Sequence, residues 1–263
     1  MTSKEIIAER EPTTIPSLTK RARMVAADPL LSVVMPVFNE RQTIDEIIRR
    51  VLAVPVRTQL IVVDDCSTDR TAEIVAGLPG VHLVRQPKNG GKGSAVRAGI
   101  ASATGEYLMI QDADLEYAPA DYLPMLRAIV EGRAGIVYGS RYLKHPGKGW
   151  LINLWSGKHP QQSLAAYVGG QSLSFIGLVF TGHYLTDTVT ALKLFPRTLL
   201  TSLSLVTTGF ELDHEITSKV LARGHRIHEV PIQYFPRSRA EGKKIGLRDW
   251  IIGIRTFHRW RNG

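Results

Sequence analysis

The chain has 263 residues, of which 44% are hydrophobic and 22% charged, as in a globular protein with a sizeable core, and its single cysteine excludes an intramolecular disulfide. The net charge of +9 is uneven, because residues 31–135 carry −2 whereas residues 136–263 carry +10. This basic half favours an anionic partner, but with 7% aromatic residues and no helix-turn-helix, RNA-recognition or zinc-finger pattern we do not expect nucleic acid.

Residues 1–30 show no sustained periodicity, and we expect them to form a flexible N-terminal arm. The arm lacks the apolar core of a signal peptide, which favours a cytoplasmic protein. The lone Cys66 agrees with a reducing compartment and is interpreted as a small filler side chain in a loop.

Short apolar runs rich in β-branched residues follow the arm and predict strands that are buried on both faces of a parallel sheet. The runs span residues 31–35, 60–63, 81–84, 107–110 and 136–138. Helices are expected between them, at residues 44–52, 70–76, 93–103 and 120–131, and Thr43 with Glu46 predicts a capping box for the first. This alternation predicts a doubly wound α/β domain that binds ligands beyond the carboxyl ends of its strands.

Polar loops follow four of the predicted strands, at residues 36–40, 64–65, 89–93 and 112–114. Each loop alone could supply only turn or cap residues, but carboxyl ends of parallel strands meet at one edge, so we expect the four loops to form one site. The loop at 89–93 has neither a P-loop nor a dinucleotide fingerprint. Its amides and Lys92 could still lie near a diphosphate.

Three acids follow the fourth strand at alternate positions, Asp112, Asp114 and Glu116. In an extended segment they would project to one face, where a hard divalent cation such as Mg²⁺ or Mn²⁺ would relieve their repulsion and receive phosphates. The alternative is an acidic loop without a ligand.

The motifs in these loops, with Gly139-Ser140-Arg141-Tyr142, resemble those of family 2 glycosyltransferases, and most of all the polyprenyl-phosphate (dolichol-phosphate mannose synthase-like) sugar transferases. The resemblance runs from about residue 31 to residue 244, with a weak stretch at 143–186. It implies the GT-A fold, with a mostly parallel sheet and a basic C-terminal acceptor region. It also implies metal-dependent, inverting transfer of a hexose from GDP-mannose or a UDP-hexose to a lipid phosphate.

The resemblance also implies roles for individual residues. The donor site would comprise Pro36, Phe38, Glu40, Val63, Asp65, Lys92, Asp112, Ala113 and Asp114. The metal ligands would be Asp112, Asp114 and Glu116, the last standing where relatives often carry Gln. The catalytic residues would be Asp114, Arg141 and Asp213. The acceptor phosphate would be bound by Arg141, Lys193, Arg237 and Lys243.

Several of these roles have simpler alternatives. Arg141 could pair with a local acid, and the other cations could be surface residues. Asp213 could act as a base for a hydroxyl acceptor, orient the substrates, or cap a helix. Because a phosphate acceptor is already ionised near neutral pH, we expect orientation more than proton transfer. His214 is interpreted as structural.

The C-terminal residues 246–263 predict an amphipathic helix. Its apolar face would carry Leu247, Trp250, Ile251, Ile254 and Phe257, with Arg248, Arg255 and Arg259 displaced from it. Such a helix could lie on an anionic membrane surface or pack on its own domain. The uncharged stretch 159–186 is interrupted by glycines and is expected to be interfacial or packed against a partner.

Together these patterns predict a GT-A catalytic domain at 31–245, with a donor half at 31–142 and an acceptor half at 143–245. The function expected is hexosyl transfer to a polyprenyl phosphate by a peripheral membrane enzyme, with homo-oligomerisation left open. The alternatives are transfer to a soluble hydroxyl acceptor, a sugar nucleotidyltransferase, and a non-catalytic nucleotide-binding module.

Overall fold

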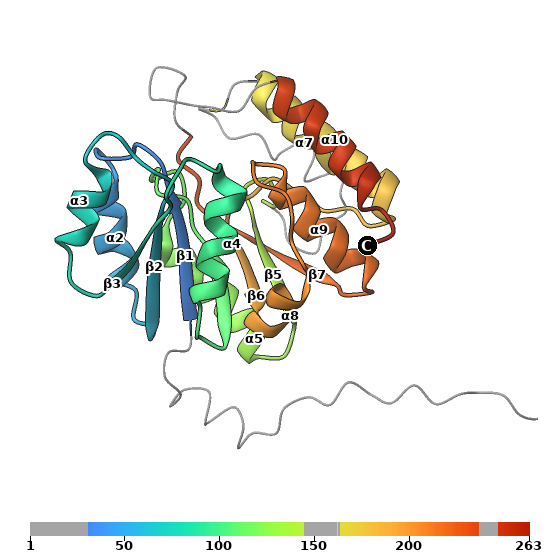
Figure 1. The fold of residues 1–263 in the computed structure, drawn as a ribbon. Helices are drawn as coiled ribbons and strands as arrows, with labels where there is room; N and C mark the ends of the chain where they lie inside the picture. Colours follow the sequence, from blue (N-terminus) through green and yellow to red (C-terminus); the bar gives the residue numbers. More distant parts are fainter. Residues whose placement is uncertain (1–30, 145–161, 163, 237–246) are drawn as a thin grey trace, which may run out of the picture.

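The computed structural model describes residues 31–144, 162, 164–236 and 247–263. Within them, seven strands form one sheet in the order β3-β2-β1-β4-β6-β5-β7 (Figure 1). Among these strands β6 alone runs antiparallel to its neighbours, β4 and β5. The predicted N-terminal arm and the candidate residues Arg237 and Lys243 lie outside the described residues.

The five predicted strands are confirmed as β1 (Leu31–Val37), β2 (Thr58–Asp64), β3 (Val81–Arg85), β4 (Tyr107–Ile110) and β5 (Ile136–Ser140). The sequence analysis did not predict β6 (Lys193–Pro196) or β7 (Ile227–Pro231). Because β6 inserts between β4 and β5, the predicted donor and acceptor halves share one sheet.

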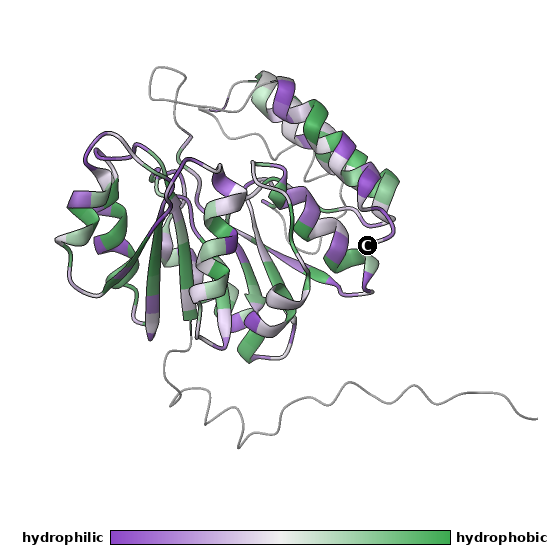
Figure 2. Cartoon of the chain, in the orientation of Figure 1, coloured by the Kyte–Doolittle hydropathy of each residue, from purple (hydrophilic) through white to green (hydrophobic). Residues whose placement is uncertain are grey.

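Side chains of alternate strand residues point to opposite faces of the sheet. Both faces therefore carry apolar side chains, and helices cover each of them. One core cluster lies beneath α2 (Ile44–Leu52), α3 (Thr71–Ala76) and α5 (Tyr122–Val130), which follows a short 3-10 turn, η1 (Pro119–Asp121). The other lies beneath α4 (Lys92–Ser102), α8 (Arg197–Ser202) and α9 (Leu212–Ala222). Figure 2 shows the hydrophobic colouring of the central strands.

The packing of α4 on the sheet is close, because a Cβ added at Gly99 would lie 2.3 Å from Cγ1 of Val34. The helix α2 begins after Thr43 as expected, but the predicted capping box is wrong. The Thr43 hydroxyl donates to the carbonyl and the carboxylate of Glu40, at 3.3 and 3.2 Å, so it is turned away from the helix amides.

Two further helices, α7 (Leu164–Thr181) and α10 (Leu247–Arg259), pack side by side, and α10 also contacts α9 (Figure 1). Phe257 of α10 is fully buried beside Gly177 and the ring of His214, and the indole N–H of Trp250 donates to Ser172 at 2.8 Å. Of the two alternatives left open for the apolar face of this helix, packing on its own domain is therefore observed for Phe257, which lies in the contact with α7 and α9. No helix in the described part of the chain is long and apolar enough to cross a bilayer.

Candidate active site

The loops that follow β1 and β2 are joined by hydrogen bonds at the carboxyl edge of the sheet. Asn39 has a positive φ of 57°, and its side-chain oxygen accepts from the amide of Thr68 at 2.8 Å. The Asn39 amide in turn donates to the hydroxyl of Ser67 at 3.0 Å. Next to these contacts, Pro36, Phe38 and Glu40 are half-buried, whereas Val63 lies fully buried beneath Gly99. The prediction that Val63 lines the donor site is therefore wrong, because Val63 lies in the core between the sheet and α4.

Asp65 ties the loop after β2 to the glycine loop after β3. Its carboxylate accepts the amides of Gly90 and Gly91, at 2.8 and 2.7 Å. Gly91 has φ of 87°, and a Cβ there would lie 2.6 Å from the carbonyl oxygen of Thr208, so only glycine suits the position. These contacts place Lys92, the first residue of α4, beside the acidic segment that follows β4.

The acidic segment bends at residues 113–116, shortly after the end of β4. Leu115 has a positive φ of 63°, so the expectation of an extended segment with three acids on one face is wrong. Asp112 pairs with Lys92 at 2.8 Å, Asp114 accepts the amide of Glu116 at 3.2 Å, and Glu116 accepts the hydroxyl of Tyr234 at 3.0 Å. Within the described ranges, no group of three or more His, Cys, Asp or Glu side chains is arranged to hold a metal ion.

Four alternating charges cross the centre of the site. Lys92 lies 2.8 Å from Asp112 and 3.8 Å from Asp213, and Asp213 is 2.5 Å from the ammonium of Lys193. Lys193 also donates to the carbonyl of Thr190 and has no exposed side-chain area. The structure therefore places Lys193 beneath Asp213, where it cannot present its ammonium at the protein surface.

The charges on Asp213 and Lys92 are mutually stabilised. Burial raises the pKa of Asp213, but Lys193 and Lys92 outweigh this effect and hold the pKa below its usual value. Burial lowers the pKa of Lys92, but Asp112 and Asp213 outweigh it, so that this pKa lies above its usual value. Burial also lowers the pKa of the neighbouring His214 to about 4, so the imidazole is neutral. Asp213 is therefore a carboxylate at neutral pH and a weak proton acceptor.

Arg141, at the end of β5, forms a two-pronged ion pair. Its Nε and Nη2 donate to the two carboxylate oxygens of Asp187, at 2.6 and 2.7 Å. The guanidinium also lies 5.2 and 5.1 Å from the ring centroids of Tyr142 and Tyr234. The alternative of pairing with a local acid is thus observed, and it fixes the plane of the guanidinium.

Sequence reasoning missed Asp187 and the carboxylate that positions it, Glu229 of β7. Glu229 accepts the amide and the hydroxyl of Thr186, both at 2.8 Å, and the amide of Asp187 at 3.0 Å. Burial raises the pKa of Glu229 to about 7. Asp187 is the first charged residue after the uncharged stretch 159–186. This position next to a long uncharged stretch is the signal that could have indicated a buried carboxylate paired with a basic side chain.

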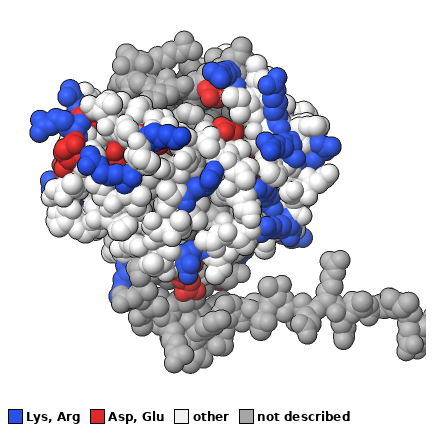
Figure 3. All heavy atoms as spheres, viewed as in Figure 1, with Lys and Arg blue, Asp and Glu red and all other residues white. Residues whose placement is uncertain are grey.

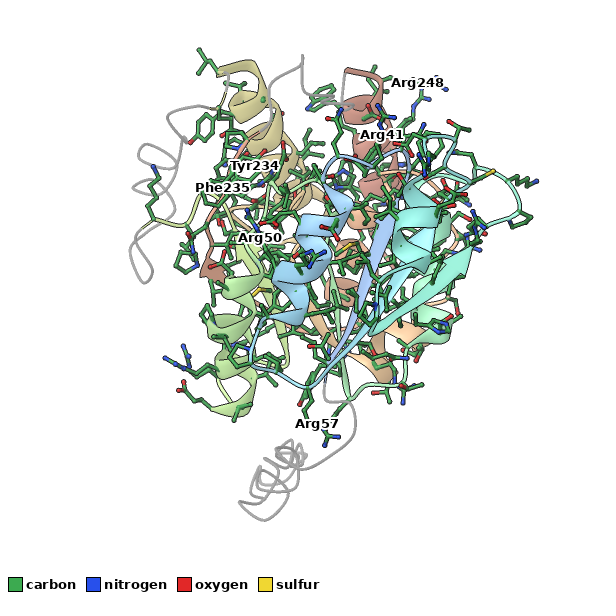
Figure 4. The ribbon with its side chains drawn as sticks, turned by 90° about the vertical axis from the view of Figure 1, so that its left-hand side faces the viewer. Arg41, Arg50, Arg57, Tyr234, Phe235 and Arg248 are labelled. Carbon is green, nitrogen blue, oxygen red and sulfur yellow. The ribbon has the colours of Figure 1, made fainter. Side chains whose placement is uncertain are left out.

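The segment after β7 returns to the acidic segment. Tyr117 and Tyr234 form an isolated antiparallel bridge, and the amide of Phe235 donates to the carbonyl of Glu116 at 2.9 Å. Figure 4 labels Tyr234 and Phe235 on this returning segment. It leads to residue 237, where the described residues are interrupted. The candidate acceptor residues Arg237 and Lys243 therefore follow a segment that is anchored beside Glu116.

Comparison with known proteins gives consistent matches. The profile of glycosyl transferase family 2 matches residues 32–179. A dolichol-phosphate mannosyltransferase of Pyrococcus furiosus is 29% identical, and the match covers 88% of this chain but only 64% of that protein. A UDP-N-acetylglucosamine–dolichyl-phosphate N-acetylglucosaminyltransferase of Methanococcus voltae is 26% identical, covering 89% and 95% of the two chains.

The structure is similar to that of glucosyl-3-phosphoglycerate synthase from Mycobacterium tuberculosis, solved with Mn²⁺, UDP-glucose and phosphoglyceric acid. The TM-score is 0.64 at 19% identity, and the superposition covers 95% of this chain and 86% of that one. At this identity the likeness concerns the fold alone, which is GT-A.

Proposed function

Because the chain belongs to glycosyl transferase family 2, we propose that it transfers a hexose, with inversion, from a nucleoside diphosphate sugar to a polyprenyl phosphate. The observation that carries the proposal is the row of charges formed by Asp112, Lys92, Asp213 and Lys193 at the carboxyl edge of the sheet. In an open α/β sheet this edge binds the ligand. The relatives named above act on dolichyl phosphate, according to their names, which supports the acceptor class.

We assign the two aspartates that follow β4 to a divalent cation that would bind together with the donor diphosphate. Asp112 and Asp114 supply hard oxygen ligands, which Mg²⁺ and Mn²⁺ prefer. Glu116, whose Oε2 accepts the hydroxyl of Tyr234, is proposed as a further ligand. Bound Mg²⁺ or Mn²⁺ would neutralise the charge that builds on the leaving diphosphate. The similar fold solved with Mn²⁺ and UDP-glucose supports this choice of ion.

A phosphate acceptor needs positively charged groups that bind and orient it more than it needs a general base. A phosphate is already ionised near neutral pH, and Asp213 is a weak proton acceptor because two lysines lower its pKa. We assign Asp213 to positioning Lys92 and the sugar. Arg141 is fixed by Asp187 and two aromatic rings, and would turn a rigid positive charge toward the acceptor phosphate. Arg237 and Lys243 are proposed as further phosphate ligands and lie outside the described residues.

A membrane surface would present such an acceptor, and α7 and α10 offer a matching face. Large apolar side chains of α7 project from the molecule at spacings of four and seven residues, which places them on one side of the helix. They are Leu164 (66% exposed), Val168 (55%), Phe175 (58%) and Val179 (65%). Beside them, α10 exposes Arg248, Arg255 and Arg259. Figure 3 shows basic side chains gathered over α10, at the upper right of that view.

The test of the proposed function is a donor and acceptor panel. The full chain is incubated with UDP- or GDP-sugars, Mg²⁺ or Mn²⁺, and either a short polyprenyl phosphate or a soluble hydroxyl acceptor. We expect release of nucleoside diphosphate, and formation of the glycolipid, with the polyprenyl phosphate only. The variant Asp114→Asn is expected to lose this activity while remaining folded, because it removes an ionised metal ligand. Turnover with the soluble hydroxyl acceptor alone would contradict this proposal and favour the alternative, a glycosyltransferase that acts on a soluble acceptor.

A further inference from the structure

Lys92 occupies a position between the groups assigned to the metal and to the sugar. Its ammonium lies 2.8 Å from Oδ1 of Asp112 and 3.8 Å from Oδ2 of Asp213, and it sits 5.7 Å from the ring centroid of Phe210. Only 14% of the side chain is exposed. Such a buried ammonium remains charged because the two carboxylates stabilise it.

The same carboxylate cannot serve the ammonium and a divalent cation without cost. A cation on Asp112 would lie close to the Lys92 ammonium, and like charges at such a separation repel strongly where water is largely excluded. The cost disappears if an anion arrives with the cation. A sugar-linked diphosphate supplies the matching negative charge, and its oxygens can accept the ammonium once it leaves Asp112.

Because of the location of Lys92, its ammonium would move only a short distance from Asp112 to a phosphate oxygen. Lys92 is the first residue of α4, whose N-terminal end favours anions through its aligned peptide dipoles. Asp213 does not need the ammonium in order to stay ionised, because Lys193 pairs with its other oxygen at 2.5 Å. The ammonium can therefore leave Asp112 for a phosphate without leaving Asp213 unpaired.

We propose that Lys92 is an internal counter-ion of Asp112, displaced by the divalent cation only when the donor diphosphate binds, so that cation and donor bind as a cooperative pair. The inference rests on the proposed function. It adds that the protein alone binds the cation weakly, and that Lys92 is the cause. The alternative is that the ion pair of Lys92 and Asp112 has a structural role only and holds α4 next to the acidic segment.

The experiment measures Mn²⁺ binding by electron paramagnetic resonance, with and without UDP, to the full chain and its variants. Without UDP we expect Lys92→Met to bind Mn²⁺ about ten- to a hundredfold more tightly than the wild type, the equivalent of one charge-assisted contact. Lys92→Arg retains the positive charge and should bind as weakly as the wild type. UDP should strengthen Mn²⁺ binding much more in the wild type than in Lys92→Met.

Lys219 provides a matched control. It is another buried lysine in a short ion pair, 2.6 Å from Glu215, on α9 and away from Asp112. Lys219→Met should leave the affinity for Mn²⁺ unchanged. Circular dichroism confirms the fold of each variant, and Lys92→Gln replaces Lys92→Met if the latter does not fold.

The outcomes separate the inference from the function on which it rests. Equal Mn²⁺ affinity of the wild type and the neutral Lys92 variants, with tightening by UDP in the wild type, would overturn the inference and leave the metal assignment standing. If the wild type binds no Mn²⁺ even with saturating UDP, the metal assignment itself is wrong, and the inference is overturned with it.

Discussion

Single carboxylates hold several loops of this fold by accepting hydrogen bonds from the backbone amides of those loops. Asp65 binds two amides of the glycine loop, and Glu215 binds the amides of Val206 and Thr207. Glu229 binds the loop at Thr186 in the same manner, but whereas Glu215 is paired with Lys219, Glu229 has an acid, Asp187, as its charged neighbour. Its burial is therefore electrostatically unfavourable, and this cost should be visible in the stability of the protein.

The stability of the wild type relative to Glu229→Gln should depend on pH. The pKa of Glu229 is about 7 in the folded protein, against 4.5 for a glutamate carboxyl group in water, so the folded state binds the proton more tightly. The stability that this proton contributes is complete below about pH 4.5 and is lost as the pH rises through 7. We expect the free energy of unfolding of the wild type to fall by about 3 kcal/mol more than that of Glu229→Gln over this interval.

Denaturant unfolding at pH 4.5 to 8 measures this difference. Glu215→Gln is a suitable comparison, because Glu215 holds a loop through similar bonds and its pKa is shifted in the opposite direction: burial raises it, but Lys219 and Thr207 lower it overall. Parallel pH profiles for the wild type and Glu229→Gln would show that Glu229 does not titrate in this range.

At the scale of elements, the first half of the fold could be predicted because its parallel strands, apart from the edge strand β3, are mostly buried and apolar. The strands that were missed carry charge: β6 begins with Lys193, and β7 contains His228 and Glu229. Their polar residues are satisfied only by tertiary partners, which no local pattern reveals. For the same reason no local pattern predicted the turn at Leu115 or identified Asp187 as the partner of Arg141.

The helix α10 illustrates the same limit, because an apolar stripe does not indicate what it packs against. The structure places α10 on α7 and α9, so truncation of its buried aromatic residue should destabilise the whole protein. We expect Phe257→Ala to lower the free energy of unfolding by about 3–5 kcal/mol. Ile251→Ala on the same helix removes a side chain that is 40% exposed, and should cost much less. Equal effects in thermal or denaturant unfolding would show that α10 is not docked as described.

At the scale of the whole molecule, the basic charge and the exposed apolar residues lie on adjacent helices. The arginines of α10 and the apolar stripe of α7 would meet anionic headgroups and the acyl boundary together. A second copy of the chain would fit this face less well, because a two-fold contact would bring arginines close to arginines. The carboxyl ends of the central strands open near these helices (Figure 1), so a lipid phosphate held at this face would lie near the edge of the sheet that carries the candidate site.

Vesicle binding tests this face with two kinds of variant. Phe175→Ser with Val179→Ser should weaken binding to anionic vesicles by about ten- to a hundredfold at any salt concentration, because burial of apolar area is not screened. Arg248→Gln with Arg255→Gln should weaken binding mainly at low salt, since the Debye length is only about 8 Å at physiological ionic strength. The control is Leu52→Ser with Leu123→Ser, which alters two side chains of α2 and α5 that are each 40% exposed. Cosedimentation in which this control loses as much binding as the α7 variant, or in which the α7 variant binds normally, would refute the assignment of α7 and α10 as the membrane-contacting face.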